Sequence, residues 1–400
     1  MVTAASPRTP YRAVLAVPEA KLLIGAMAPV RLGYAMAGLA MVLLIRDRTG
    51  SFILAGLGLG LFSFAAAVLA PLRGHLVDTL GQTRPLSLYL PVFCCAFGLL
   101  PLARAPWLLM TLCTISGAMS PPLLASSRAL WRPIVGAELL RPAYAVDAVS
   151  MQVSAVLGPA AAAALVAAAG GPAAIWCVTA LVAIGGALFV AIPASRRWRG
   201  DPTAGGFRGA VSAPGVRTLI GVAACTGTAL GAITLALTGI AQEAGSTVGA
   251  GLLIAALALG SAVGGGWAGA RTIRRGPAVG MATGLGVLAT CLLIATLASA
   301  STPLAIMLIV GGLGLGPANV YLLELIDRSA PLGSQVAAFA AVVAVEGGFV
   351  GLGSLLAGRA ADAGGAHAGL VVAGVAEFLA AAILLMRRRS LSGRAAADGR

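Results

Sequence analysis

The sequence predicts an all-α polytopic membrane protein with twelve transmembrane helices in two six-helix bundles. Its composition is the first reason: 59% of the 400 residues are apolar, 10% are charged, and the mean hydropathy is +0.97. Soluble domains carry roughly 25% charged residues, and a soluble fold has too little interior for this much apolar surface. In hydrocarbon every backbone polar group needs an internal partner, which leaves helices or a closed barrel.

The apolar stretches favour helices. Barrel strands alternate apolar and polar residues, whereas Leu54–Leu72 and Leu285–Ala298 do not. Because a span needs about 20 apolar residues, we expect helices near residues 22–45, 51–72, 86–103, 106–127, 145–169, 172–193, 217–240, 247–269, 278–299, 302–324, 333–357 and 367–386.

A polar stretch rich in Gly, Pro and Arg interrupts this series between the sixth and seventh helices. The predicted organisation is an N-terminal tail (1–21), a first bundle (22–193), a linker (194–216), a second bundle (217–386) and a C-terminal tail (387–400).

The distribution of positive charge supports the helix count. The tails and the connections after every second helix contain 22 of the 27 Lys and Arg residues, Arg73 and Arg84 among them. By the positive-inside rule both termini are cytoplasmic, and the protein is expected in the cell membrane. A net charge of +14 would suggest a nucleic-acid partner in a soluble protein, but here the basic residues form short clusters between apolar runs, so no such partner is predicted.

The connection after the second helix, residues 74–84, carries a recognisable motif. It reads Gly-His-Leu-Val-Asp-Thr-Leu-Gly-Gln-Thr-Arg and resembles the cytoplasmic signature Gly-x-Leu-Ala-Asp-Arg-x-Gly-Arg-Arg of the major facilitator superfamily. Thr79 replaces a basic residue of that signature, and the matching residues are Gly74, Leu76, Asp78, Gly81 and Arg84. The resemblance implies a gating role for Gly74, Asp78, Gly81 and Arg84, and we expect Arg128 to belong to the same gate.

A degenerate copy of the motif begins at Gly266, 192 residues later. It keeps the basic end, but Ala270 stands in place of the aspartate. Ser120-Pro121 and Gly316-Pro317 correspond at a similar offset, as do Gly158-Pro159 and Gly351-Leu352. Duplicated halves around a central site are how such carriers are built.

The resemblance implies a secondary transporter that moves a small amphipathic molecule by alternating access, with proton-coupled efflux as the expected mode. Gly158 and Pro159 lie in the fifth helix, where drug–proton antiporters of the superfamily carry a Gly-Pro motif associated with export. The flanking glycines are missing here, so a simple helix kink is the alternative, as it is at Gly316 and Pro317. An importer, or a receptor or assembly protein of the same fold, stays open.

Ionisable residues inside spans are functional candidates because their insertion is costly. Arg31 could bind an anionic substrate group, hold a counter-ion or snorkel to the headgroups. Glu346 is expected to carry a proton, since desolvation favours a neutral carboxyl; a permanent ion pair, for example with Arg31, is the alternative. Asp147, Gln152 and Asn319, the last beside an expected unwound turn at Gly316-Pro317, complete the substrate or coupling candidates.

No enzyme chemistry is predicted. The sequence has two histidines without metal-ligand partners, six cysteines within apolar segments and no Gly-rich phosphate loop ending in Gly-Lys-Ser/Thr. We therefore expect no metal and no cofactor. The expected partners are a small-molecule substrate, a proton or another ion and the lipid bilayer, and the protein is expected to be a monomer.

Overall fold

The computed structural model describes residues 9–136, 138–199, 212–269, 276–298, 301–330 and 335–391, and these residues form helices and short connections. The first half contains α1 (Thr9–Ala16), α2 (Pro18–Thr49), α3 (Phe52–Leu80), α4 (Thr83–Leu99), η1 (Leu100–Leu102), α5 (Pro106–Ala118), α6 (Leu123–Val135), α7 (Leu140–Ala191) and α8 (Pro193–Arg197). The second half contains α10 (Pro214–Glu243), α11 (Thr247–Gly269), α12 (Pro277–Ala295), α13 (Ser301–Ser329), α14 (Gln335–Gly364), α15 (Ala368–Met386) and η2 (Arg388–Leu391).

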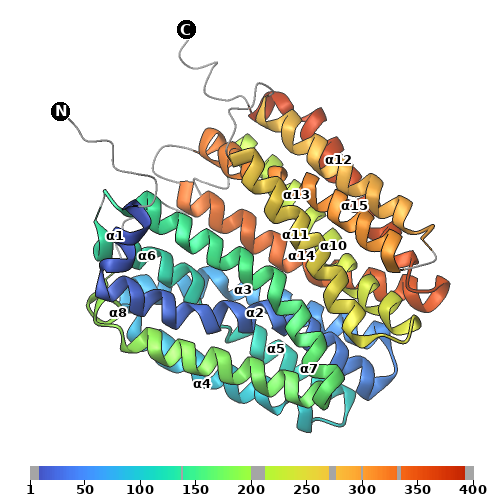
Figure 1. Cartoon of the computed structure of the whole chain (residues 1–400), viewed down its shortest axis with the longest axis horizontal. Helices are drawn as coiled ribbons and strands as arrows, with labels where there is room; N and C mark the ends of the chain where they lie inside the picture. Colours follow the sequence, from blue (N-terminus) through green and yellow to red (C-terminus); the bar gives the residue numbers. More distant parts are fainter. Residues whose placement is uncertain are drawn as a thin grey trace.

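The number of membrane spans agrees with the prediction of twelve. In the described ranges, eleven helical segments are long and apolar enough to cross a membrane, with α5 and α6 counted as one. One of the eleven belongs to α7, whose 52 residues would extend about 78 Å as a single helix, far beyond a hydrocarbon core of about 30 Å. Gly170 (φ 81°, ψ 168°) interrupts α7, and the chain reverses there (Figure 1), so α7 supplies two spans.

Several helices extend past the apolar runs that predicted them. The tail predicted over 1–21 contains α1 and the first turn of α2, and α3 continues to Leu80 rather than ending near residue 72. Hydropathy identifies only the part of a helix that lies in lipid, whereas the ends of the helix depend on capping residues and prolines. Pro18, Pro106, Pro214 and Pro277 accordingly open α2, α5, α10 and α12, because the first turn needs no N–H from them.

The fourth span is broken, although a single helix over 106–127 was predicted. α5 ends at Ala118 and α6 begins at Leu123. Pro121 and Pro122 lie between them and have no N–H to donate to the carbonyls one turn earlier. Two adjacent prolines therefore end the helical ladder, and the chain resumes as α6 to Val135.

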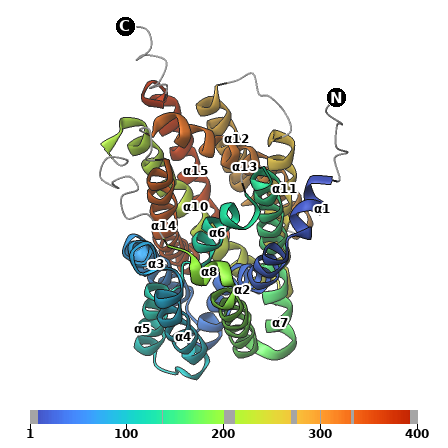
Figure 2. The same ribbon diagram turned by 90° about the vertical axis from the view of Figure 1, so that its left-hand side faces the viewer.

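The helices form two groups that lie against each other, the first half lower and the second half upper in Figure 2. α3 packs against α14, and α7 against α11, across the boundary between the halves. Glycines allow backbones to approach there: a Cβ added at Gly56 would lie 2.4 Å from the Ser354 carbonyl oxygen, and one at Gly251 would lie 2.3 Å from that of Pro159. Small residues at helix crossings serve this purpose in lipid, where the hydrophobic effect does not hold helices together.

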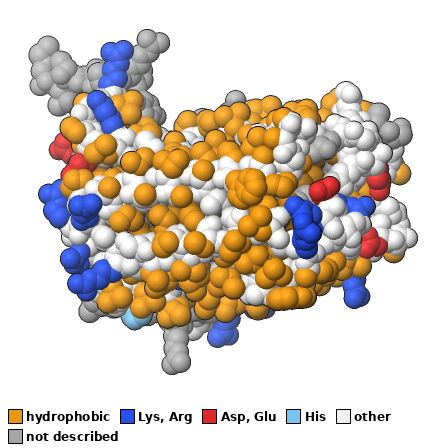
Figure 3. Space-filling view, turned by 90° about the horizontal axis from the view of Figure 1, so that it is seen from below, with side chains coloured by type: hydrophobic (Ala, Val, Ile, Leu, Met, Phe, Trp, Pro, Cys, Tyr) orange, Lys and Arg blue, Asp and Glu red, His pale blue; other side chains and the backbone are white. Residues whose placement is uncertain are grey.

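The surface is that of a membrane protein. Figure 3 shows a broad hydrophobic band on one face, with most of the Lys, Arg, Asp and Glu side chains towards its two ends. Large apolar side chains such as Trp107, 70% exposed, and Phe64, 59% exposed, face outwards. In water this exposure would be costly, so the band is the surface that contacts lipid.

Candidate functional site

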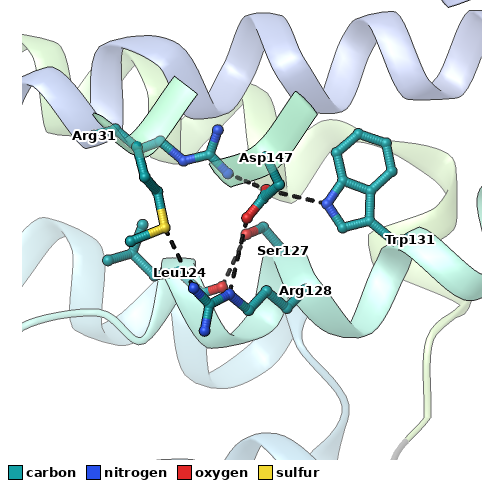
Figure 4. Close-up of polar contacts among 7 residues, drawn as sticks. Arg31, Leu124, Ser127, Arg128, Trp131 and Asp147 are labelled. Atoms are coloured by element: carbon teal, nitrogen blue, oxygen red, sulfur yellow. Dashed lines mark hydrogen bonds and ion pairs between the residues drawn. The ribbon is translucent and has the colours of Figure 1, made fainter. Parts of the chain in front are cut away.

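A buried ion pair joins the first and fifth spans. Arg31 of α2 donates from Nη2 to the Asp147 Oδ1 of α7, and the two residues are 5% and 4% exposed. Trp131 of α6 donates from Nε1 to the same oxygen at 3.1 Å. Three helices thus converge on one carboxylate (Figure 4), and the indole helps to satisfy a charge that would otherwise be expensive within the membrane.

Arg128 brings a second cation to this carboxylate. Its Nε lies 3.8 Å from Asp147 Oδ2, on the other side from Arg31 (Figure 4), and its Nη2 lies 3.3 Å from the Met151 sulfur. The Arg128 guanidinium carbon is also 6.0 Å from the ring centroid of Phe339 on α14. Arg128 therefore links the buried pair to the second half of the molecule.

Close packing of α2 on α7 sets the position of the pair. A Cβ added at Gly158 would lie 2.4 Å from the Ala35 Cβ, and one at Gly33 would lie 2.9 Å from a methyl group of Val182. The glycines bring the helix axes together so that Arg31 reaches Asp147 without entering lipid. Gly158 thus has a packing role, and α7 continues as a helix through Pro159.

The pairing of Arg31 answers two questions left open by the sequence. Arg31 pairs with Asp147 and not with Glu346, and its burial excludes snorkelling to the headgroups. Arg31 and Asp147 are 116 residues apart in the chain, so sequence reasoning proposed each of them separately and missed the pair.

The second half holds acidic residues in place of an ion pair. Glu346 of α14 is half-buried, and its carboxyl lies near the Thr226 side chain of α10. Glu377 of α15 is 2% exposed, lies within electrostatic range of Glu346, and has a buried Oε2 without a hydrogen-bond partner. Among the described residues neither carboxyl has a cation within ion-pair distance.

The remaining substrate candidates do not belong to the ion-pair cluster. Gln152 is half-buried on α7, five residues after Asp147, and Asn319 is exposed on α13. The unwound turn expected before Asn319 is wrong, because α13 stays helical through Gly316 and Pro317. Gly316 is needed for packing instead: a Cβ there would lie 2.1 Å from the Ser261 carbonyl oxygen of α11.

The residues of the signature loop lie at the end of α3 and the start of α4. Asp78 and Arg84 are exposed, Gly74 has no neighbour near its Cβ position, and Gly81 makes the turn with φ 81°. Gln82, which the motif comparison passed over, is fully buried: its Nε2 donates to the Ser126 carbonyl at 3.0 Å, and its Oε1 accepts from Ser195 Oγ at 3.0 Å. Of the second copy, residues 270–275 lie outside the described residues.

Arg73 corrects the charge analysis, which assigned it to a loop. It is 7% exposed inside the bundle, where Nη1 donates to the carbonyls of Gly117 at 2.9 Å and Ala118 at 3.0 Å. These carbonyls would normally accept from the N–H groups of residues 121 and 122, which are prolines. The guanidinium replaces the missing donors, and the adjacent Pro-Pro sequence is the signal that could have predicted it.

Comparison with known proteins agrees with this architecture. Residues 23–221 match the family model of the Major Facilitator Superfamily. The human organic anion transporter MFSD10 (TETRAN) has a similar structure, with a TM-score of 0.66 and 16% identity over 94% of this chain and 100% of that one. The nucleoside transporter NupG gives a TM-score of 0.71 and 12% identity over 92% of this chain and 98% of that one, and a point mutant of NupG gives a TM-score of 0.72. Among curated proteins no sequence matches the chain.

In the described residues, twelve spans in two groups of helices define a polytopic membrane protein with the fold of these two transporters. The family model of the Major Facilitator Superfamily matches the first half, and the fold is shared with the two transporters across more than nine-tenths of the chain.

Proposed function

We propose that the protein is a secondary active transporter of the cell membrane that exports a small amphipathic molecule in exchange for protons. The observation that carries the proposal is the two-bundle fold, with charged or acidic groups held inside each bundle. An insertion cost of a few kcal/mol or more makes such groups functional candidates, and no nucleotide-binding motif supplies another source of energy.

Alternating access requires a contact that closes at each end of the bundles in turn. At the end away from the termini, the close approaches of Gly56 to Ser354 and of Gly60 to Gly351 seal the halves together. At the other end, Arg128 reaches Phe339 across the boundary. We infer that rocking breaks the first set of contacts while it tightens the second.

The ion-pair cluster suits a coupling role. Asp147 lies between two guanidinium groups, so an anionic substrate group that competes for Arg31 or Arg128 would weaken the contacts of the carboxylate. Release of Arg128 would also free its contact with α14. Gln152 and Asn319 would supply hydrogen bonds to the substrate.

Glu346 is the proposed proton carrier. It lies within a span, with Glu377 as its acidic neighbour and without a cation partner among the described residues. Because an unpaired charge in hydrocarbon is costly, binding a proton lowers the energy of the state in which this carboxyl faces no water. Export is inferred from the Gly158-Pro159 motif of the fifth span.

Transport by proteoliposomes under an imposed pH gradient tests the proposal, with amphipathic dyes and drugs preselected by thermal shift as the probes. We expect the native protein to show flux driven by the pH gradient. Flux by Glu346→Gln should not depend on the gradient, although substrate exchange at equal pH should persist. Glu324→Gln is the control, since Glu324 lies in an exposed pair with Arg328 and should transport normally.

Unchanged gradient dependence in Glu346→Gln would remove Glu346 from coupling. Binding of several compounds without any flux would favour a receptor of the same fold. Inside-out and right-side-out vesicles separate export from import, because only one orientation accumulates the compound under a given gradient.

A further inference from the structure

A basic pocket of about 450 Å³ lies at the α3–α4 turn, separate from the ion-pair cluster and from Glu346. Its lining combines three arginines with two hydroxyl-bearing side chains and one leucine: Arg84, Arg196, Arg199, Thr79, Thr83 and Leu80. Among the described residues, no acidic side chain lines it and none of the three arginines forms an ion pair. The pocket is therefore suited to an anion.

Buried polar contacts hold the pocket in shape. The fully buried Gln82 ties the start of α4 to α6 through the Ser126 carbonyl and to α8 through Ser195. Ser195 immediately precedes Arg196, so these contacts fix the segment that carries two of the arginines. Arg199 lies against the turn, since a Cβ at Gly81 would be 3.0 Å from its Nη1.

A buried hydroxyl and a helix start point to a ligand. The Oγ1 of Thr83 is buried and has no hydrogen-bond partner, and a buried hydroxyl without one is costly. Thr83 is also the first residue of α4, a 17-residue helix whose start has no side-chain cap. The first N–H groups of a helix carry partial positive charge and bind anionic oxygens readily.

The surroundings favour a phospholipid as the source of the anion. Leu80 lines the pocket and is 48% exposed, and Leu88, one turn beyond Arg84 on α4, is 61% exposed. The pocket thus lies where the apolar band meets the basic end of the molecule, the end with α8 that faces the viewer in Figure 2. A headgroup phosphate could enter it while the acyl chains lie along α4.

We propose that this pocket binds the phosphate of an anionic phospholipid in the adjacent leaflet. The three arginines provide charge-assisted hydrogen bonds, while Thr83 Oγ1 and the start of α4 provide neutral donors. Basic pockets at membrane interfaces recognise lipid headgroups in this way. The site does not depend on transport, so its test is independent of the proposed function.

Native mass spectrometry of the full-length protein measures the affinity directly, with dioctanoyl-phosphatidylglycerol as the probe and dioctanoyl-phosphatidylcholine for comparison. We expect tighter binding of the anionic lipid. The pocket variant Arg84→Gln/Arg196→Gln/Arg199→Gln should weaken it on the order of 100-fold. Thr83→Val should weaken it less, by roughly three-fold to ten-fold.

A matched variant, Arg132→Gln/Arg387→Gln/Arg388→Gln, controls for the general effect of charge. It removes three exposed arginines, predicted for the same side of the membrane, that do not line the pocket. Equal weakening in the two triple variants would overturn the proposal. If inorganic phosphate at the same concentration displaced the dioctanoyl-phosphatidylglycerol completely, the pocket would be a site for free phosphate, and the proposal of a lipid ligand would be overturned.

The arginines could instead only neutralise the C-terminal carbonyls of α3. In that case the pocket variant would melt at a lower temperature with and without lipid, and the stabilisation gained on adding phosphatidylglycerol would match that of the native protein. This result would also overturn the proposal.

Discussion

The two halves of the molecule share an architecture but handle polar groups in different ways. In the first half, Arg31 is neutralised by Asp147, and Arg73 is hydrogen-bonded to backbone carbonyls. The residues 192 positions after Arg31 and Asp147 are Ala223 and Phe339. The second half therefore lacks this ion pair, and its carboxyls Glu346 and Glu377 form none with the residues that the structure describes. A satisfied ion pair fixes a structure, whereas an unpaired carboxyl can change its protonation.

The broken fourth span and its counterpart show the same contrast. Pro121 and Pro122 separate α5 from α6, and Arg73 supplies the donors that are lost there. α13 of the second half has a single proline beyond its first turn, Pro317, and continues unbroken from Ser301 to Ser329. Gly265 occupies the position 192 residues after Arg73. The unbroken α13 is therefore accompanied by a glycine at the position where the broken fourth span has an arginine that supplies hydrogen bonds.

The largest expected effect comes from removing the carboxylate of the first half. Asp147→Ala leaves Arg31 buried without a partner, which should cost about 3–5 kcal/mol and lower the melting temperature in detergent markedly. Glu19→Ala is the control, because it breaks an exposed pair with Arg197 and should cost less than about 1 kcal/mol. The double variant Arg31→Met/Asp147→Leu should recover much of the lost stability. Equal melting temperatures of Asp147→Ala and Glu19→Ala would contradict a buried pair.

Arg73→Met should have the next largest effect. The Ala118 carbonyl would lose its Arg73 donor, whereas the Gly117 carbonyl would keep the Ser120 N–H at 3.2 Å. The expected cost is about 1–3 kcal/mol, measured by thermal unfolding. The substitution should be milder in a Pro121→Ala/Pro122→Ala background, because those residues would donate through their own N–H groups. A double-mutant cycle measures this coupling, and strict additivity would refute the compensation.

Substitution of glycine separates contacts between the halves from contacts within one half. A Cβ at Gly60 would lie 3.0 Å from the Gly351 carbonyl oxygen across the boundary, whereas one at Gly353 would lie 1.8 Å from that of Thr228 within the second half. Gly353→Ala should lower the melting temperature. Gly60→Ala should instead open the contact: about 1 kcal/mol of strain shifts an opening equilibrium roughly five-fold, measurable by cysteine labelling at that end. Equal labelling of the native protein and Gly60→Ala would argue against a moving boundary there.

The smallest effect is expected at Arg128, which is partly exposed. Arg128→Gln removes a distant charge pair and a cation–π contact with Phe339, worth about 0.5–1 kcal/mol together. Stability should change little, while labelling of cysteines near the N-terminal end of α14 should increase. No change in labelling would remove Arg128 from the gate.

The sequence predicted the fold well because hydropathy is a local property and lipid admits few alternatives to helices. It did not predict the pairing of Arg31 with Asp147, since contacts between distant residues are not visible in a local pattern, although two opposite charges within predicted spans were a usable signal. Arg73 was misplaced because a charge near a helix end is normally solvated. Nothing in the sequence singled out Trp131, whose side chain is the same as that of the other four tryptophans.

The reversal at Gly170 has a mechanical consequence. A single non-helical residue joins the span that touches α11 to the span that packs on α4, so the connection contains no slack to absorb a relative shift. When one of the two spans moves, the other must move with it, and so must α4. The first bundle would then tilt as a rigid body, and the structural change would be confined to the contacts between the halves.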